Sequence, residues 1–269
     1  MESEKLKMSF DPHTIEHLGI KMYSVLPNAI AELIANAYDA EAHTVHVKLY
    51  NDNGNKRIAV MDDGVGMSFD EINNNFLRIG RKRRTDDDGL SPNGIRKVTG
   101  RKGLGKLAFF GIGDTIRITT CKNGQCVKFT LSWSDLMSTN SQEYEPKFSI
   151  SQCDAKQNGT IIELDDLKRK SDFDKDGLAI SLSKLFNFFD DTFQVYVSYN
   201  EEDEILVDNK LKYQNLSSQI VWNFPNGDVT NKYLENHNVH GCILATEKPL
   251  KPGLRGITLF AHGRLVNAP

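Results

Sequence analysis

Residues 28–40 read Asn-Ala-Ile-Ala-Glu-Leu-Ile-Ala-Asn-Ala-Tyr-Asp-Ala and predict a helix that is apolar around nearly its whole circumference. The polar positions in it are Asn28, Glu32, Asn36 and Asp39. They recur every three or four residues, so they line one narrow stripe of the helix. The pattern indicates a helix that is buried over most of its surface and keeps a strip of carboxylates and amides. Residues 14–40 together read as one long helix.

A β-hairpin is expected directly after this helix. Val45, Val47 and Leu49 alternate with polar residues as in a strand, and a polar turn over 51–55 separates them from a second strand that begins at Ile58. Further strand-like segments are 115–121, 126–132, 147–151, 160–164, 193–198 and 204–207, and an amphipathic helix is expected over 177–189. A helix, a hairpin and then a run of strands with a further helix favour an α+β fold, a two-layer sandwich.

The composition excludes several classes of protein. The 269 residues include 33 basic and 36 acidic side chains, and the formal net charge of −3 points to neither nucleic acid nor a membrane as partner. No apolar run approaches the ~20 residues that a membrane span needs. The charged N-terminus also lacks the apolar core of a signal peptide. A soluble, cytoplasmic protein is therefore expected.

One segment departs from this balance of charge. Residues 78–106 carry a net charge of +7, and seven glycines or prolines fall between residues 79 and 105. So many glycines and prolines exclude a continuous helix. A basic, glycine-containing segment on an acidic body suits the binding of an anion, and a solvated loop or a nucleic-acid patch are the alternatives.

The four cysteines do not make a disulfide scaffold. Cys121 and Cys126 flank the expected hairpin turn Asn123-Gly124, so they face one another across two strands. A disulfide is geometrically conceivable there, but a cytosolic chain of this kind predicts reduced thiols. No cysteine–histidine cluster has the spacing of a zinc site.

Three segments carry residue types suited to chemistry. Glu32 could take a proton from water, and Asn36, one turn later, offers a hard oxygen ligand for Mg²⁺ that is shared with substrate phosphates. Asp62 ends a strand and can accept a hydrogen bond from an exocyclic amine, while the glycines at 64 and 66 let a planar ligand approach the backbone. Residues 100–106, Gly-Arg-Lys-Gly-Leu-Gly-Lys, precede a short apolar helix start and direct backbone N–H groups at an anion. Each segment alone also fits a polar seam, a tight turn or a solvated loop.

In this order the segments resemble the motifs of the GHKL ATPase superfamily, which includes gyrase B, the large heat-shock chaperone, histidine kinases, MutL and the MORC proteins. Residues 31–40 resemble its N-box, most closely that of bacterial MORC-like ATPases, and 60–67 resemble its adenine-binding motif. Residues 79–82 and 100–108 resemble the ATP lid, and Gly159-Thr160 resembles the last motif. The resemblance covers about residues 14–165. More weakly, 256–266 are similar to the first strands of a transducer domain.

This resemblance implies a fold and a set of roles. The fold is the GHKL (Bergerat) sandwich with a mixed, mostly antiparallel sheet. Glu32 is implied as the general base, Asn36 as the Mg²⁺ ligand, and Asp62 as the partner of the adenine amino group, supported by Thr160 through water. The other residues implied in ATP binding are Asp39, Gly64, Gly66, Met67, Gly80, Lys82, Gly103, Leu104, Gly105 and Lys106.

The resemblance also implies an organisation and an activity. Residues 1–210 are expected to form the ATP-binding domain with its lid over 78–106, and 211–269 a connector and the start of a transducer-like domain. The implied function is Mg²⁺-dependent ATP binding and slow hydrolysis that close the lid and a homodimer, in the N-terminal module of a larger MORC-like or MutL-like protein acting on DNA.

Alternatives to this function are an ATP-dependent chaperone and a nucleotide-binding scaffold without hydrolysis. A histidine kinase is disfavoured because His13 and His17 lie too close to residue 28 to form a phosphoacceptor hairpin. Family ATPases also bring a lysine or arginine to the γ-phosphate from the transducer domain. The candidates for that residue here are Lys251, Arg255 and Arg264.

Overall fold

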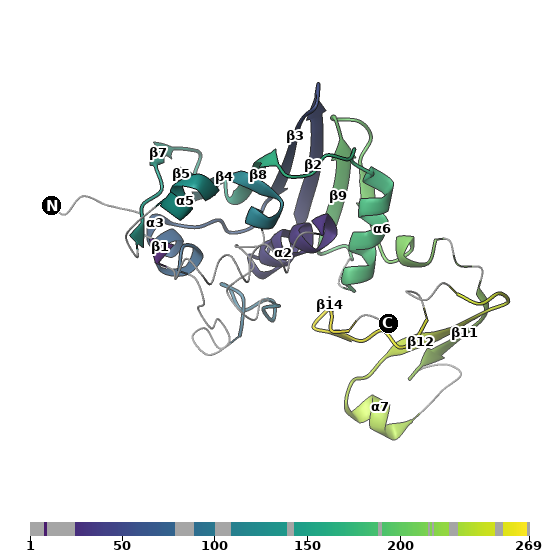
Figure 1. Ribbon diagram of the computed structural model, residues 1–269. Coiled ribbons are helices and arrows are strands. Elements are labelled where there is room, and N and C mark those ends of the chain that lie inside the picture. Colours follow the sequence, from purple (N-terminus) through teal and green to yellow (C-terminus); the bar gives the residue numbers. More distant parts are fainter. Residues whose placement is uncertain are drawn as a thin grey trace.

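The computed structural model (Figure 1) describes the chain in segments. These are residues 8–9, 25–78, 89–99, 109–138, 143–187, 190–214, 216, 218–225, 231–250 and 255–267. Several of the residues implied in ATP binding lie outside the described residues, and they are Gly80, Lys82, Gly103, Leu104, Gly105 and Lys106.

The helix that carries the polar stripe is α2, Leu26–Asp39. The expectation of one helix over 14–40 is wrong at its N-terminal side, because Val25 is extended and the helix begins at Leu26. Pro27 explains this boundary, since proline has no backbone N–H and is tolerated only in the first turn of a helix. Most side chains of α2 are buried, including Ile30 and Ile34, which are fully covered.

Eight strands form the main sheet in the order β10-β9-β2-β3-β8-β4-β5-β7. Their bounds are β2 Thr44–Asp52, β3 Asn55–Asp62, β4 Gly113–Lys122, β5 Gln125–Ser132, β7 Phe148–Gln152, β8 Gly159–Leu167, β9 Gln194–Tyr199 and β10 Ile205–Val207. Every neighbouring pair is antiparallel except β2 and β9, which are parallel. The mixed, mostly antiparallel sheet of the predicted α+β sandwich is therefore confirmed.

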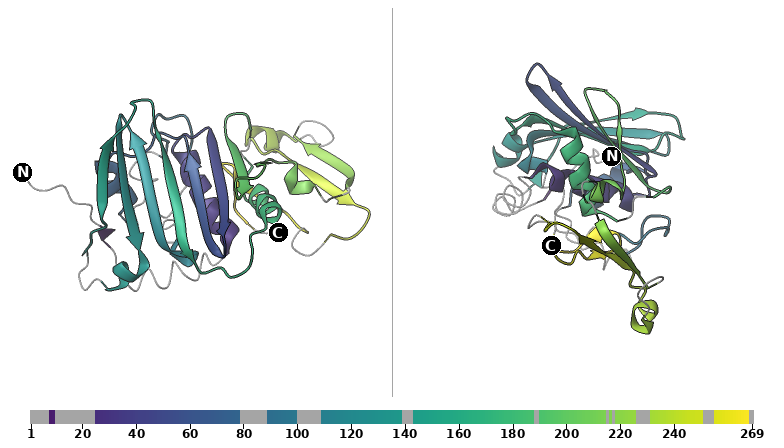
Figure 2. Two further views of the ribbon diagram at one scale, coloured as in Figure 1. Left: turned by 90° about the horizontal axis from the view of Figure 1, so that it is seen from above. Right: turned by 90° about the vertical axis from the view of Figure 1, so that its right-hand side faces the viewer.

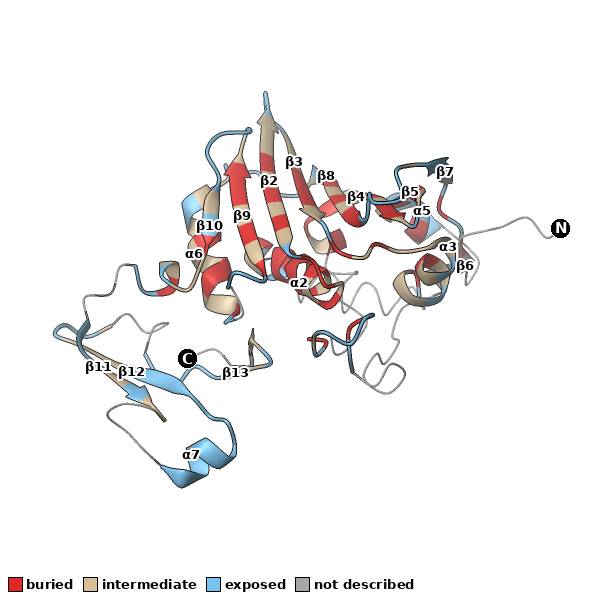
Figure 3. Cartoon of the chain, turned by 180° about the vertical axis from the view of Figure 1, so that it is seen from behind, coloured by how far each residue is buried: buried red, intermediate tan, exposed pale blue. Residues whose placement is uncertain are grey.

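Helices cover one face of this sheet (Figures 1 and 2). α2 and α6, Lys175–Leu185, form the second layer. The strands bury alternate residues toward it: Val45, Val47 and Leu49 are fully buried, and the alternation is visible along β2 in Figure 3. This burial is why the alternating pattern in the sequence identified the strand. The hydrophobic core of the described residues lies between the two layers.

Short elements follow the hairpin β2–β3. α3, Phe69–Glu71, begins with a capping box between Ser68 and Glu71 and continues as a π-helical turn over Ile72–Phe76. α5, Trp133–Ser138, follows β5, and a small pair joins β1, Met8–Ser9, to β6, Glu143–Tyr144.

The C-terminal part contains two hairpins. β11, Ser218–Phe224, pairs with β12, Gly241–Thr246, and α7, Lys232–Asn236, lies between them in the chain. β13, Phe260–Ala261, pairs with β14, Arg264–Leu265, and both strands fall within the segment 256–266. β14 also contacts the segment directly after α6: Arg264 forms a bridge with Phe186, and Asn187 N donates to Gly263 O at 2.6 Å.

The cysteine pair requires a correction. Cys121 and Cys126 form a disulfide, whereas reduced thiols were expected. They are directly opposite one another in the β4–β5 register, with their Cα atoms 4.1 Å apart. The hairpin therefore places the two sulfurs within bonding reach whatever compartment the rest of the composition suggests. Among the described helices, none has the length and apolar character needed to cross a membrane.

Candidate functional site

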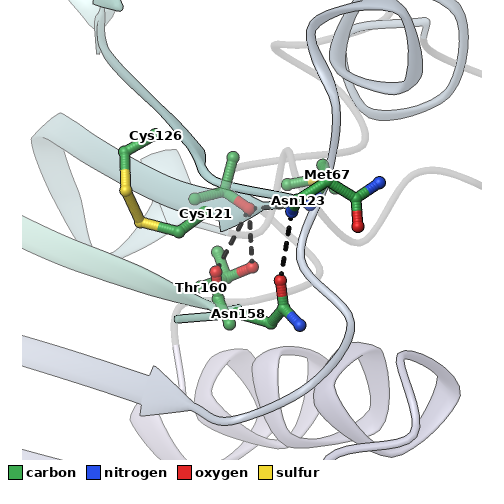
Figure 4. Close-up of a disulfide and its surroundings, with 8 residues drawn as sticks. Met67, Cys121, Asn123, Cys126, Asn158 and Thr160 are labelled. Carbon is green, nitrogen blue, oxygen red and sulfur yellow. Dashed lines mark hydrogen bonds between the residues drawn. A yellow bond between two sulfur atoms is a disulfide. The ribbon is translucent and has the colours of Figure 1, made fainter. Parts of the chain in front are cut away.

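Three oxygen-bearing side chains lie in a row across neighbouring strands. Asp62 on β3 is opposite Thr160 on β8, and Thr160 is opposite Thr120 on β4. The hydroxyl oxygens of Thr120 and Thr160 are 3.1 Å apart, and the contact is drawn in Figure 4. Asp62 has the strand parity of Ile58 and Val60, which face the helices, so the row lies on the covered face of the sheet.

Asp62 is an unusual carboxylate. Burial raises the pKa of Asp62 to about 6, although the backbone N–H groups of Gly64 and Thr160 favour its ionised form and lower the pKa. The Gly64 N–H donates to Asp62 Oδ1 at 3.0 Å. A partly buried carboxyl that these hydrogen bonds do not fully compensate is suited to accept a donor from a ligand.

The loop over 62–67 lies directly against the ends of the core strands. A Cβ on Gly66, whose φ is +65°, would lie 2.0 Å from Cys121 O, and a Cβ on Gly159 would lie 2.2 Å from Asp62 O. Only glycine permits these approaches of one backbone to another. Met67 N then donates to Thr120 Oγ1 at 2.9 Å, which fixes the end of the loop over the threonine row (Figure 4).

α2 meets the same loop at its C-terminal end. Val65 N donates to Ala40 O at 3.0 Å, and a Cβ on Gly64 would lie 2.7 Å from that oxygen. Asn36 is one turn before Ala40 and Glu32 one turn before Asn36, so the polar stripe leads away from the loop along the helix. Asn36 is half-buried, and no hydrogen bond engages its side-chain amide within the part of the chain that the structure describes.

Glu32 is engaged by a residue from the far end of the chain. Arg264 Nη2 contacts Glu32 Oε1, and the two side chains are 26% and 16% exposed, respectively. A cavity of about 160 Å³ opens beside this pair. It is lined by Asn28, Ala31, Glu32, Leu185, Phe186, Arg264 and Leu265. The cavity thus adjoins Glu32 and does not include Asp62.

Asp39, the last polar residue of the stripe, is buried and holds a different segment. Its Oδ1 accepts hydrogen bonds from Thr99 N at 2.7 Å and Thr99 Oγ1 at 3.0 Å. Thr99 is the residue immediately before segment 100–108. Asp39 therefore holds Thr99, the last described residue before the glycine motif to which the resemblance assigns phosphate binding.

Two residues of this region, Glu41 and Arg96, make contacts that the sequence did not predict. Glu41 accepts from Ser91 Oγ at 2.5 Å and from Asn93 N at 2.8 Å and Nδ2 at 2.6 Å. Burial would raise the pKa of Glu41, but these hydrogen bonds outweigh it and lower the pKa. Arg96 donates to the carbonyls of Tyr38, Ala42 and Thr192. Arg96 had been counted with the basic charge over 78–106, and no local pattern distinguishes it from its neighbours.

The structure thus brings most of the described candidates together. Asp62, Gly64, Gly66, Met67 and Thr160 surround one loop at the strand ends. Asn36 and Glu32 continue from that loop along α2, and Asp39 lies at its C-terminal end. The arrangement offers an acceptor for an exocyclic amine, an amide oxygen for a hard cation and a carboxylate for a water molecule.

A comparison with protein families finds a match over this part of the chain. The sequence model described as "Histidine kinase-, DNA gyrase B-, and HSP90-like ATPase" matches residues 23–160. That span begins just before α2 and ends at Thr160, so it includes the stripe, the loop and the threonine row.

Full-length relatives carry different names. "Putative type II restriction enzyme HgiDII" from Herpetosiphon aurantiacus is 31% identical over 227 residues, which are 82% of this chain and 35% of that protein. "TNF receptor-associated protein 1 homolog, mitochondrial" from Dictyostelium discoideum is 30% identical over 44% of this chain and 19% of its own length. "Chaperone protein HtpG" from Nocardia farcinica is 26% identical over 45% and 22%, respectively. The chain spans about a third or less of each of these relatives.

Proposed function

The chain belongs to the family of histidine kinase-, DNA gyrase B- and HSP90-like ATPases, and from this we propose that it binds ATP with Mg²⁺ and hydrolyses it slowly. The observation that carries the proposal is the row of Asp62, Thr160 and Thr120 beneath the glycine loop. Glycine lets the loop lie against the backbone of Cys121 and Ala40, and this packing holds the Asp62 carboxylate in place at the strand end. ATP binding is expected throughout the family, and the residue roles below are our proposal.

In this proposal Asp62 accepts the hydrogen bond of the adenine amino group. The Thr120 hydroxyl is already engaged by Met67 N, Gly159 O and Thr160, so it holds the loop and the neighbouring threonine in place. Thr160 then supports the base beside Asp62. Gly64 and Gly66 let the loop pack against Ala40 and Cys121 beside the base, and Met67 closes its end.

Asn36 is the residue that would hold Mg²⁺. Its amide oxygen is a hard ligand, and no described residue occupies that amide, so the donor fits the ion. Bound there, Mg²⁺ would neutralise charge on the phosphates of ATP. Glu32, one turn away, orients a water and takes its proton, which is the role of a general base.

Glu32 must leave Arg264 to act as a base, because the guanidinium occupies one of its carboxylate oxygens. Arg264 lies on β14 within the segment proposed as the start of a transducer-like domain. We therefore propose that this hairpin restrains Glu32 until nucleotide phosphates compete for the guanidinium. Slow turnover follows, since the restrained form must open before each cycle.

The segment proposed as the lid has a fixed part. Within 78–106, residues 89–99 are held to the end of α2 through Glu41, Asp39 and Arg96. Arg96 is consequently committed to backbone carbonyls and is not counted among the phosphate ligands. The proposed phosphate contacts of Gly80, Lys82, Gly103, Leu104, Gly105 and Lys106 remain predictions from the sequence.

The experiment that tests the ATPase measures binding by calorimetry and phosphate release in the same samples. Asp62→Asn is expected to weaken Mg-ATP binding about tenfold or more, and Glu32→Gln to bind but not hydrolyse. Asp52→Asn and Glu201→Gln, at exposed positions, are the matched controls and should behave as wild type. Absence of ATP binding by the wild type would refute the proposal, and hydrolysis by Glu32→Gln would refute the assigned base.

For the larger protein we propose an ATP-gated homodimer that acts on DNA, in the manner of a MORC-like or MutL-like protein. The relative named as a restriction enzyme supports DNA as the partner, because restriction enzymes cut DNA. The relative named as a chaperone favours a second candidate, ATP-dependent chaperone action. Molar mass with and without a non-hydrolysable ATP analogue tests the dimer. Stimulation of ATPase activity by duplex DNA supports the first candidate, and suppression of client aggregation the second.

A further inference from the structure

Three sulfur atoms meet at one corner of the main sheet. The Sγ atoms of Cys121, Cys126 and Cys153 all lie within 4.8 Å of one another. Cys121 and Cys126 are joined, while Cys153 is a free, half-buried thiol. A thiol this close to a disulfide has a natural reaction partner, because a thiolate attacks disulfide sulfur directly.

The strand register determines which sulfur Cys153 faces. Cys126 on β5 is opposite Ser151 on β7, and Cys153 comes two residues after Ser151. Residues two apart in an extended chain point to the same face, so Cys153 is the diagonal neighbour of Cys126. The Cys153 N–H donates to Gly124 O at 2.9 Å, which holds it beside the β4–β5 turn. Cys121 lies one strand further away in the sheet order β4-β5-β7.

We propose that Cys121, Cys126 and Cys153 form a thiol–disulfide exchange site in which Cys153 attacks Cys126. The Cys153 thiolate forms a new bond to Cys126 Sγ, the bond between Cys126 and Cys121 breaks, and Cys121 leaves as a thiolate. The proton lost by Cys153 is replaced by one that Cys121 takes from water. One disulfide and one thiol are present before and after, so no external oxidant or reductant is needed.

Exchange changes which strands are covalently linked beside the proposed nucleotide site. The Cys121–Cys126 bond ties the last part of β4 to β5, whereas a Cys126–Cys153 bond ties β5 to the end of β7 and frees Cys121. The Cys121 carbonyl oxygen is the atom against which Gly66 packs, and the preceding residue is Thr120, which accepts from Met67 N. This inference rests on the proposed nucleotide site. We infer that exchange loosens the end of β4 beneath that site and weakens nucleotide binding.

Alkylation trapping tests the exchange. The protein is purified without reductant in a Cys242→Ser background, which removes the other free thiol, and is held with iodoacetamide before non-reducing digestion and mass mapping. The expected result is label on Cys121 together with a Cys126–Cys153 disulfide. Label on Cys153 alone, with Cys121–Cys126 intact, overturns the exchange site. With Cys153→Ser added, no label is expected, and label on Cys121 or Cys126 in that variant overturns the disulfide itself.

A matched pair of variants tests the coupling to the nucleotide. Cys121→Ser retains only the Cys126–Cys153 bond, and Cys153→Ser retains only the Cys121–Cys126 bond, so each carries one disulfide and one new serine. Calorimetry with a non-hydrolysable ATP analogue and Mg²⁺ is expected to give about fivefold weaker binding for Cys121→Ser. Equal affinities overturn the coupling. Absence of binding by both variants and by the wild type refutes the proposed nucleotide site, while the mass mapping still decides the exchange site.

Discussion

The burial of Asp62 makes the free energy of unfolding depend on pH. Because the pKa of this carboxyl is raised from 3.8 to about 6, the folded protein binds its proton more tightly than the unfolded chain does. The resulting stability is fully present below about pH 4 and is lost as the pH rises through 6. Asp62→Asn cannot titrate, so its stability relative to wild type should improve by about 1–3 kcal/mol between pH 4 and pH 8. Urea unfolding at a series of pH values measures this.

Asp52→Asn provides the comparison, because Asp52 is exposed at the end of β2. Its difference from wild type should stay constant over the same range of pH. A constant difference for Asp62→Asn as well would mean that the folded structure does not raise the pKa of this carboxyl. The same variant is expected to bind ATP more weakly at pH 8, so a gain in stability accompanied by a loss of binding would identify Asp62 as a residue held for function.

Gly66 is expected to tolerate no side chain. Its φ of +65° disfavours other residues, and an added Cβ would lie 2.0 Å from the Cys121 carbonyl oxygen. Gly54 also has a positive φ, +93°, but nothing lies within 4 Å of its added Cβ. Gly54→Ala should therefore cost only the backbone strain, about 1–2 kcal/mol, and Gly66→Ala about 3 kcal/mol or more. Equal losses in urea unfolding would contradict the close contact of the loop with β4.

The segment 89–99 depends on Glu41 in the turn after α2. Both carboxylate oxygens of Glu41 accept hydrogen bonds, two at Oε1 and one at Oε2. Glutamine keeps only one side-chain oxygen as an acceptor. Glu41→Gln should therefore release residues 89–99 and lower the free energy of unfolding by about 1–2 kcal/mol. Hydrogen–deuterium exchange is expected to rise over 89–99 and to stay unchanged in the hairpin β2–β3.

Glu201→Gln is a close control for that substitution. Glu41 and Glu201 both have a left-handed backbone, with φ values of 60° and 62°, but Glu201 is exposed. The control should leave exchange over 89–99 unaffected. If Glu41→Gln were equally silent, the hydrogen bonds to Ser91 and Asn93 would not be what holds this segment.

The elements that sequence periodicity could identify are those whose burial is regular. Val45, Val47 and Leu49 face the helices at every second position, and the polar stripe of α2 recurs with the helical period. Residues 89–99 have no such period. They are held by Glu41 and Arg96, whose partners lie about 50 or more residues away and whose charges resemble those of any solvated loop. Hydrogen bonds between residues so far apart in the chain leave no local pattern, so the sequence alone does not predict them.

The cysteines illustrate the same limit. Reduced thiols were expected from the average behaviour of cytosolic proteins, whereas the outcome depends on the register that makes Cys121 and Cys126 direct partners. The hairpin turn at Asn123-Gly124 was predictable, and so was the facing of the two residues. The approach of Cys153 was not, because it depends on β7 pairing with the far side of β5.

The last described hairpin, β13–β14, contacts segments that lie much earlier in the chain. Arg264 reaches Glu32 across 232 residues of sequence, and Gly263 accepts from Asn187 N after α6. Nearby, Lys212 donates to Phe186 O at 2.9 Å and lies over the ring of Phe260. Burial lowers the pKa of Lys212 to about 8, which reflects how far this junction excludes water. The candidate base is therefore part of a contact between α2 and the β13–β14 hairpin.

A double-mutant cycle measures how much the contact between Glu32 on α2 and Arg264 on β14 contributes to the free energy of unfolding. Glu32→Gln and Arg264→Met each remove one charge, and the pair is partly shielded from solvent, so we expect a coupling free energy of unfolding of about 1–2 kcal/mol. The exposed pair of Lys168 and Asp114, with 37% and 47% of the side chains accessible, is the control and should couple by less than about 0.5 kcal/mol. Urea unfolding of both cycles at one ionic strength makes the comparison. Coupling within about 0.3 kcal/mol of zero for Glu32 and Arg264 would mean that the hairpin does not restrain the base, and the slow turnover proposed above would then need another cause.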